Sequence, residues 1–270
     1  MASLLIAGYG FLGRALENKF LSAGWNVDKL SRGGTDGCIR CDISSSEDVS
    51  GLSGDYDLII HCAASGGGGE ASYRRVYLEG VRNLLARFPD ARLVFTSSTS
   101  VYSQTDHGEV TESSAAIPAT PTAKILREAE ETVIGARGVV TRLSGLYGPG
   151  RCHVLKNLLS GTATLDGKGG RIMNFIHRDD VARAVFLLGT LPLFPQGEIF
   201  NVTAGPVSQH DCYAALARHF DRPMPASAVS QAPRKRGNSS KKVSNAKLKN
   251  LGWSPQYNDF LSLALNCRLD

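Results

Sequence analysis

The 270-residue sequence predicts an α/β fold, in which a doubly wound parallel sheet of the Rossmann type carries a small C-terminal substrate lobe. Three features favour this class. Short apolar segments alternate with longer helical ones over residues 1–145, as they do in βαβ units. A glycine-rich turn directly follows the first apolar segment. Beyond Arg142 the alternation loosens into connections that are rich in Gly and Pro.

The predicted strands are short and apolar enough to be buried on both faces of a parallel sheet. They occupy residues 4–7, 26–30, 38–41, 58–61, 93–96 and 139–142, the usual complement of this fold. Between them, a helix over 12–23 stops at Gly24, and a helix over 73–88 ends just before Pro89.

The second half of the chain predicts a helix at 179–188, a strand at 198–202 and a helix at 209–220. We expect residues 1–150 to form the dinucleotide-binding domain, with 175–204 returning to it. The smaller lobe then comprises residues 151–174 and 205–270. Within it, residues 223–242 combine Pro, Ser and basic side chains with few apolar ones, which predicts a mobile loop.

Composition indicates a globular protein, since 42% of residues are hydrophobic and 20% charged. No basic leader precedes the N-terminal apolar residues, and no run approaches the roughly 20 apolar residues of a membrane span, so we expect a cytoplasmic protein without a membrane partner. The net charge of +5 suits a phosphate-bearing ligand or a nucleic acid. The densest basic stretch, residues 234–242, lacks the interleaved aromatics of single-strand binders, which favours a small-molecule partner.

No metal site is predicted. Cys38 and Cys41 have Cys-x-x-Cys spacing, but residues three apart in a strand point to opposite faces, and no second pair completes a zinc set. His177 stands near two acidic residues, but Asp179 lies where a helix begins and is suited to capping its free amides.

The motif Gly8-Tyr9-Gly10-Phe11-Leu12-Gly13 follows a predicted strand and opens a helix, which is the context that a dinucleotide fingerprint requires. Gly8 permits the tight turn, Gly10 lets the backbone approach a pyrophosphate, and Gly13 lets the helix pack on the strand. The first helical amides, at Phe11 and Leu12, then point toward the phosphates. The sequence therefore predicts a bound dinucleotide.

Ser31 and Arg32 follow the second predicted strand, where an acidic residue normally selects NAD. A hydroxyl and a guanidinium instead suit the 2′-phosphate of NADP. We therefore expect NADP as the cofactor. NAD stays the alternative, which applies if Arg32 is only a solvated loop residue.

With these residues in view, the sequence resembles the extended short-chain dehydrogenase/reductase superfamily, and within it the NAD-dependent epimerase/dehydratase branch, across nearly the whole chain. Asp42-Ile43 looks like the pair whose carboxylate contacts the adenine amine, and Cys62-Ala63-Ala64 looks like the fourth-strand segment that lines the cofactor. Residues 96–102, Tyr147 to Gly150 and Asn174 to Ala182 resemble further landmarks in the right order.

One departure concerns catalysis. The family pair is Tyr-x-x-x-Lys, and alignment on the following helix places Thr120 at the tyrosine and Lys124 at the lysine, which in the family also binds the cofactor ribose. A threonine hydroxyl is a far weaker acid than a phenol with a pKa of about 10. The chain therefore looks most like an atypical subgroup that lacks the active-site tyrosine.

The family's serine position is Ser98, whose hydroxyl can bind a carbonyl or alcohol; the alternative is a serine that caps a strand end. Tyr77 and Tyr102 are candidate replacement acids, with packing as their alternative role. On this alignment, Thr120→Tyr should raise turnover, although Pro121 biases residue 120 away from helical dihedral angles.

Two functions follow from these observations. The first is an NAD(P)-binding oxidoreductase or epimerase-like enzyme, with Ser98, Thr120 and Lys124 at its site, which acts on a hydroxyl or carbonyl of a nucleotide-sugar-like substrate. The second is a non-catalytic NADP-binding sensor or scaffold. The sequence leaves a homodimer open.

Overall fold

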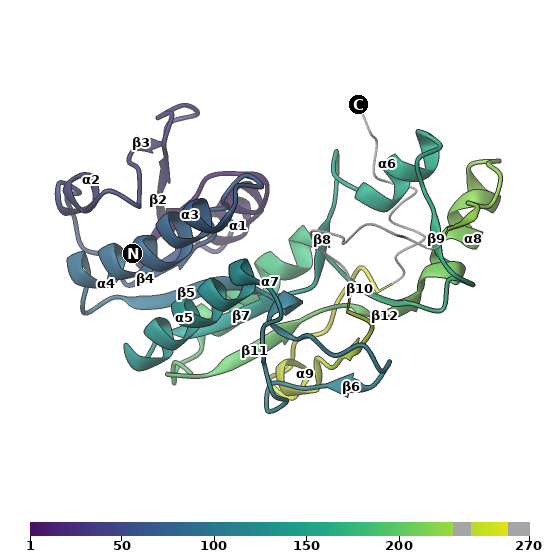
Figure 1. Ribbon diagram of the computed structural model, residues 1–270. Coiled ribbons are helices and arrows are strands. Elements are labelled where there is room, and N and C mark those ends of the chain that lie inside the picture. The colour runs from purple at the N-terminus through teal and green to yellow at the C-terminus, as the bar shows by residue number, and fades with distance from the viewer. Residues whose placement is uncertain (229–238, 259–270) are drawn as a thin grey trace.

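The computed structural model describes residues 1–228 and 239–258. Its main sheet has the strand order β11-β7-β5-β4-β1-β2-β3, and every neighbouring pair is parallel (Figure 1). The strands are β1 Ser3–Ala7, β2 Asn26–Ser31, β3 Ile39–Arg40, β4 Leu58–His61, β5 Arg92–Ser98, β7 Val139–Leu143 and β11 Ile199–Val202. The order reverses between β1 and β4, which confirms the predicted doubly wound fold and opens a crevice at that point.

Side chains on the central strands alternate between the two faces of the sheet. Leu4 and Ile6 of β1 pack with α1 (Phe11–Leu21) and α7 (Arg178–Thr190), whereas Leu5 packs on the opposite face. That face is covered by α2 (Ser46–Ser50), α4 (Gly80–Arg87) and α5 (Pro121–Gly135). All three β1 side chains are fully buried, and each contributes about 1.5–3 kcal/mol of hydrophobic free energy.

The predicted helices at 12–23, 179–188 and 209–220 are confirmed as α1, α7 and α8 (Gln209–His219). The helix predicted over 73–88 starts earlier and has three parts: α3 Glu70–Tyr73, a π-helical turn η1 over Arg74–Glu79, and α4. A Cβ added at Gly80, where α4 begins, would lie 2.9 Å from Cδ1 of Ile43, so the helix packs closely on this side chain, which would have to shift for a larger residue.

A smaller lobe follows β7 and was only partly predicted. Its sheet has the order β12-β10-β8, from Gly205–Ser208, Ile172–His177 and Gly145–Tyr147. Helix α6 (His153–Leu159) and α8 lie beside this sheet, as Figure 1 shows, and the lobe has a separate hydrophobic core. The short strands β9 (Leu165–Asp166) and β13 (Ser227–Ala228) pair within the lobe.

The described part of the C-terminal segment differs from the mobile loop expected at 223–242. Residues 227–228 belong to β13, and β14 (Lys242–Val243) pairs with β6 (Glu109–Val110). The basic residues Arg234, Lys235 and Arg236 lie outside the described residues. Short backbone pairing thus orders both ends of this stretch, where the prediction fails, whereas residues 229–238 lie outside the described residues.

Helix α9 (Ala246–Lys249) then returns the chain to the main sheet. Leu248 and Trp253 pack in the same core as α1 and α7, and Trp253 Nε1 donates to the carbonyl oxygen of Asp180 at 3.2 Å. The division of the chain at residues 150, 174 and 204 stays a prediction.

The N-terminus of α7 corrects one assignment. His177, not Asp179, is the capping residue, because its Nδ1 accepts a hydrogen bond from the Asp179 amide at 3.3 Å. Burial lowers the pKa of His177, which favours the neutral ring that such an acceptor requires. Asp179 itself lies in the first helical turn, where its charge suits the helix dipole.

Within residues 1–228 and 239–258, no helix has both the length and the apolar character that a membrane crossing requires.

Candidate functional site

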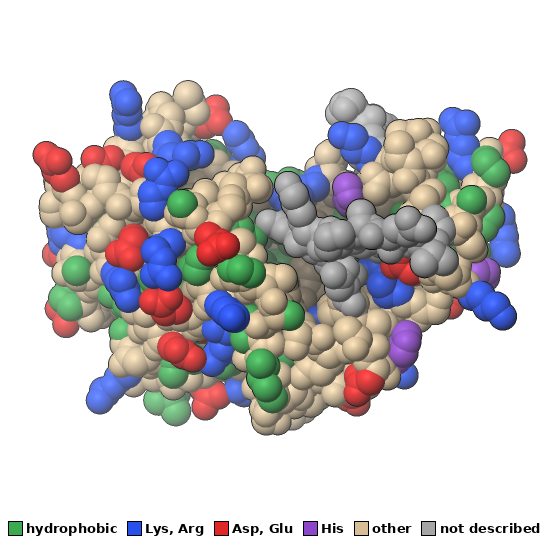
Figure 2. Space-filling model, in the orientation of Figure 1, with side chains coloured by type: hydrophobic (Ala, Val, Ile, Leu, Met, Phe, Trp, Pro, Cys, Tyr) green, Lys and Arg blue, Asp and Glu red, His purple; other side chains and the backbone are tan. Residues whose placement is uncertain are grey.

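A cavity of about 970 Å³ opens along the carboxyl ends of the central strands, where Rossmann folds bind their ligands. It runs from the glycine-rich turn after β1, past the ends of β2, β4 and β5, to the residues that precede β14. Figure 2 shows the surface hollowed between the parallel sheet and the lobe. Of the predicted cofactor residues, all but Gly13 and Lys124 line this cavity.

The three glycines of the turn have different steric roles. A Cβ at Gly8, where φ is +112°, would lie 2.3 Å from the backbone nitrogen of Ala63, and a Cβ at Gly13 would lie 2.5 Å from the Gly8 carbonyl oxygen. A Cβ at Gly10 would meet no protein atom within 4 Å and would enter the cavity. Helix α1 starts at this turn without a side-chain cap. Its first amides and the space at Gly10 therefore fit a pyrophosphate.

The residues after β2 and β3 form one end of the cavity. The Ser31 hydroxyl accepts a hydrogen bond from the Gly34 amide at 3.1 Å, while Arg32 is exposed and lines the cavity. Arg14, which follows the third glycine, instead pairs with Asp36 at 2.6 Å. Arg32 is thus the cation of this turn that lines the cavity.

Asp42 lies at the same end. Its Oδ1 accepts from the amide and the hydroxyl of Ser44, at 3.0 and 2.8 Å. Although burial opposes ionisation, these bonds and the charges of Arg32 and Arg75 lower the pKa of Asp42. The carboxylate is therefore ionised at neutral pH and can accept a hydrogen bond from a ligand amine.

The middle of the cavity carries no charge. Cys62 Sγ lies 3.2 Å from the Gly8 carbonyl oxygen, and burial raises the pKa of this thiol to about 12. His61, the last residue of β4, is fully buried, and burial lowers its pKa to about 4, which leaves the ring neutral. Ile43, Ala63 and Ala64 complete the lining here. An uncharged wall of this kind suits the flat, apolar side of a ring ligand.

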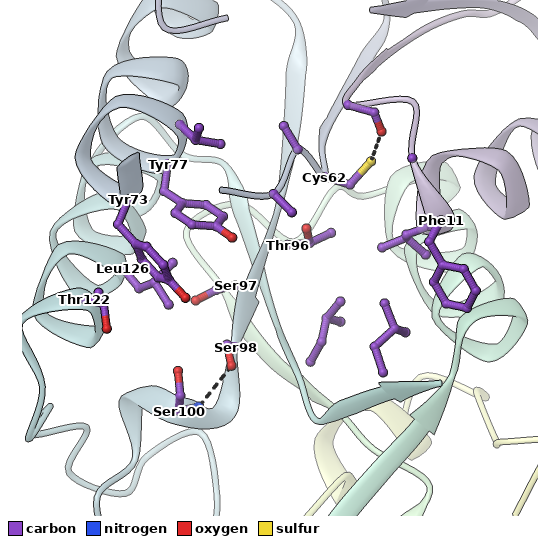
Figure 3. Close-up of a pocket in the computed structure, with 18 of the residues that line it drawn as sticks. Phe11, Cys62, Tyr73, Tyr77, Thr96, Ser97, Ser98, Ser100, Thr122 and Leu126 are labelled. Atoms are coloured by element: carbon purple, nitrogen blue, oxygen red, sulfur yellow. Dashed lines mark hydrogen bonds between the residues drawn. The ribbon is translucent and has the colours of Figure 1, made fainter. Parts of the chain in front are cut away.

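The far end of the cavity contains Ser98 and Thr120 (Figure 3 shows Ser98). Ser98 Oγ accepts from the Ser100 amide at 3.2 Å and so caps a short turn, while its own proton stays available for a ligand. Thr120 is the N-cap of α5, with Oγ1 accepting from the Ala123 amide at 3.3 Å, and Pro121 is the first helical residue. Thr120 thus precedes the helix on which the family's tyrosine was placed.

The structure does not bring Lys124 into the cavity. Its side chain is exposed, whereas Thr122 and Leu126 of α5 line the cavity (Figure 3). Successive helical residues are 100° apart, so Lys124, two residues from each, lies on the opposite side of the helix. Thr122 and Leu126 have the spacing of the Tyr-x-x-x-Lys pair. The helix therefore presents neither a phenol nor a lysine at these positions.

The two tyrosines proposed as replacement acids differ in their surroundings. The Tyr102 hydroxyl is buried, accepts from Arg142 Nη1 at 2.7 Å and lies 3.0 Å from both Asn201 Oδ1 and the Thr111 carbonyl oxygen. Burial raises the pKa of Tyr102. These contacts make it a structural residue. Tyr77 reaches into the cavity from η1, beside Tyr73, and its hydroxyl accepts from the Ser65 amide at 3.4 Å (Figure 3).

Two buried polar residues at this end were not among the predicted site residues. Ser144, directly after β7, lines the cavity, and its buried Oγ has no hydrogen-bond partner among the described residues. Lys241 is only 4% exposed and also lines the cavity. Lys241 belonged to a stretch predicted to be mobile, and an apolar strand next to Ser144 gave no sign of a free hydroxyl.

A family model for the NAD-dependent epimerase/dehydratase family matches residues 4–203 of the sequence. The chain belongs to this family. The epimerase/dehydratase resemblance of the sequence is thereby confirmed, and the family's NAD dependence agrees with the glycine turn. No curated protein sequence matches the chain.

Solved structures show the same fold for this epimerase/dehydratase family member. A protein of Methylobacillus flagellatus assigned to the NAD-dependent epimerases/dehydratases is 26% identical, with a TM-score of 0.79 and coverage of 98% of this chain and 97% of that chain. UDP-glucuronic acid 4-epimerase of Bacillus cereus, in complex with UDP-glucuronic acid and NAD, is 20% identical, with a TM-score of 0.82 and coverage of 98% of both chains. The dTDP-glucose 4,6-dehydratase of Bacillus anthracis, in complex with NAD, is 17% identical, with a TM-score of 0.80 and coverage of 98% and 96%.

Proposed function

We propose that this chain binds NADP(H) and catalyses an oxidoreductase or epimerase/dehydratase reaction at a hydroxyl or carbonyl of a nucleotide-sugar-like substrate. One observation carries the proposal. The same cavity extends from a glycine turn that fits a pyrophosphate to a separate group of polar residues between the sheet and the lobe. A dinucleotide and a second ligand can therefore meet inside it.

Four groups would hold the cofactor. The Gly10 turn and the first amides of α1 would bind the pyrophosphate, and the Asp42 carboxylate would accept from the adenine amine. Ser31 and Arg32 would bind a 2′-phosphate, because both line the cavity and a guanidinium pairs with phosphate. This arrangement supports NADP over NAD.

The remaining polar groups would serve the substrate. When bound, the nicotinamide would supply hydride transfer. The Ser98 hydroxyl can donate to a substrate oxygen, and the unpartnered Ser144 hydroxyl can bind a second polar group. Arg151 also lines the cavity and adds a positive charge that suits a diphosphate. The nucleotide-sugar ligand of the Bacillus cereus epimerase supports this substrate class.

A non-catalytic NADP-binding role is the second candidate function. Thr122 and Leu126 of α5 line the cavity at the spacing of the family's tyrosine and lysine, and neither can replace them. Incubation with NADP(H) and a panel of UDP- and dTDP-sugars and small carbonyls separates the two. Absorbance at the nicotinamide band would report net oxidation or reduction, and NMR of the sugars would report epimerisation, which consumes no cofactor. The Gly10→Val variant, which should not bind the cofactor, gives the background rate. Turnover by the wild type above this background supports an enzymatic function. Tight NADPH binding without any product would establish the non-catalytic function instead.

A further inference from the structure

Lys241 is held inside the protein by neutral groups alone. Its Nζ donates to the carbonyl oxygen of Tyr102 at 2.8 Å and to the hydroxyl of Ser239 at 2.7 Å. An ammonium has three N–H donors, so one donor remains after these two bonds. Because Lys241 lines the cavity, this third donor is available to a ligand there.

The surroundings of Lys241 disfavour a permanent charge. No carboxylate among residues 1–228 and 239–258 lies within ion-pair distance of its Nζ, and a buried charge without a partner costs several kcal/mol. Charged or titratable groups on the elements packed around it are Tyr102, His107, Glu109, Glu112, Arg142, Arg171, His177 and Lys242. Burial is what lowers the pKa of the Lys241 ammonium, to about 8. Ammonium and amine are therefore both populated near neutral pH.

Both ends of the Lys241 residue are fixed in place. Its carbonyl oxygen accepts from Asn174 Nδ2 at 2.9 Å, and Oδ1 of the same amide accepts from the Val243 nitrogen at 3.0 Å. At the other end, Nζ is anchored on Tyr102, whose hydroxyl is held by Arg142 and Asn201. A long side chain that is held in this way has already lost its rotamer freedom, as an acid–base group should.

We infer that Lys241 is the acid–base residue of the proposed reaction and takes the place of the tyrosine that α5 lacks. The inference rests on the proposed function. A bound reduced nicotinamide would supply the hydride for the new C–H bond at the substrate carbonyl carbon. Lys241 Nζ would donate the proton with which the C=O π electrons form the O–H bond. The N–H bond that breaks leaves a neutral amine, which regains a proton from solvent. The reverse reaction uses the amine as base.

A titration of the protein without cofactor tests the first requirement. In protein labelled with ¹³C at the lysine Cε, the resonance that disappears in Lys241→Met is expected to titrate near pH 8. The resonances of exposed lysines are expected to titrate near 10.4. A value for Lys241 near 10.4 would overturn the inference, because the ammonium would then be a permanent charge.

Kinetics test the second requirement. Lys241→Met is expected to lower kcat about 10²- to 10⁴-fold and to remove the limb of the pH–rate profile near pH 8, with NADPH affinity unchanged. Lys242→Met, at an exposed neighbour, should preserve both the rate and the profile. Full recovery of kcat in Lys241→Arg would overturn the inference in favour of a fixed charge that binds an anion. Turnover that survives Lys241→Met would reject only this role, whereas absent turnover in the wild type would reject the proposed function as well.

Discussion

Arg142 Nη2 donates to Glu130 Oε2 at 2.7 Å, and this ion pair is almost completely buried, with the two residues 1% and 0% exposed. The pair joins β7 to α5. Oε1 of Glu130 also accepts from the Ser97 hydroxyl at 2.6 Å, and Arg142 continues to the Tyr102 hydroxyl. Burial opposes the charge of Arg142, but the bonds to Glu130 outweigh it and raise the pKa of the guanidinium. The network thus fixes two strands and the wall of the cavity.

Removal of one partner of this pair should therefore be costly. Glu130→Gln leaves the Arg142 charge buried without a carboxylate, and we expect the free energy of unfolding to fall by about 3–5 kcal/mol. Glu131→Gln is the matched control, because its 66% exposed carboxylate pairs with Arg127 at the surface, where such pairs contribute about 0–1 kcal/mol. Urea denaturation measures both variants. Equal losses would show that the buried pair has no special role in stability.

His61 predicts a pH dependence of stability. Burial lowers its pKa to about 4 in the folded state, below the ordinary value of 6.5. Protonation of His61 therefore favours the unfolded state. The contribution of neutral His61 to the free energy of unfolding is complete above pH 6.5 and is lost as the pH falls from 6.5 to 4. The loss amounts to about 3 kcal/mol at 1.36 kcal/mol per pKa unit. Denaturation curves at several pH values should show it as the difference between the wild type and His61→Gln, and identical pH slopes would contradict it.

The Gly10 turn predicts a variant that loses the cofactor but keeps the fold. A valine at this position meets no protein atom at Cβ, so thermal stability should be nearly unchanged. Its side chain enters the space proposed for the pyrophosphate, and binding of NADPH and NADH should fall below detection. Gly135→Ala, at the end of α5 where Cβ also has open space, is the control. Titration calorimetry that finds binding retained in Gly10→Val would mean that the turn is only structural.

Arg32 predicts the cofactor preference. The wild type should bind NADPH more tightly than NADH, and Arg32→Ala should narrow that difference by about 1 to 3 kcal/mol, the range for a hydrogen bond to a charged group. Arg40→Ala removes a nearby exposed guanidinium that does not line the cavity and should leave the preference intact. Fluorescence titrations of both dinucleotides with the three proteins give the six affinities needed. Equal affinities in the wild type would end the assignment of NADP.

The sequence was informative wherever function depends on the backbone. The spacing of Gly8, Gly10 and Gly13 and the alternation of Leu4, Leu5 and Ile6 reflect geometry that every dinucleotide-binding Rossmann fold shares. Both the fold class and the start of the cavity could therefore be predicted.

The catalytic end was harder to predict, because side-chain direction there depends on where a helix begins. The cavity-lining residues of α5, Thr122 and Leu126, lie two positions after the pair expected from the sequence. Lys124 therefore faces solvent. Lys241 reaches the site from a distant segment through contacts with Tyr102, which no local pattern records.

The register of α5 gives the final prediction, which is a rescue. Thr122 and Leu126 line the cavity one turn apart, so Thr122→Tyr with Leu126→Lys should place a phenol and a lysine where Thr120 and Lys124 cannot. In the Lys241→Met background, we expect this pair to restore turnover by about 10²-fold or more, since a positioned acid contributes about 10²- to 10⁴-fold.

Two matched variants decide what that rescue means. Thr122→Phe with Leu126→Lys has the same bulk and lysine without the hydroxyl, and it should restore nothing if proton transfer is the missing step. Thr120→Tyr tests the competing register, and it should also fail, because residue 120 is the N-cap with φ of −116° and ψ of 149°, outside the helix. A rescue by Thr120→Tyr but not by the Thr122→Tyr pair would show that the family's tyrosine corresponds to residue 120, and the helical argument from Lys124 would then be wrong.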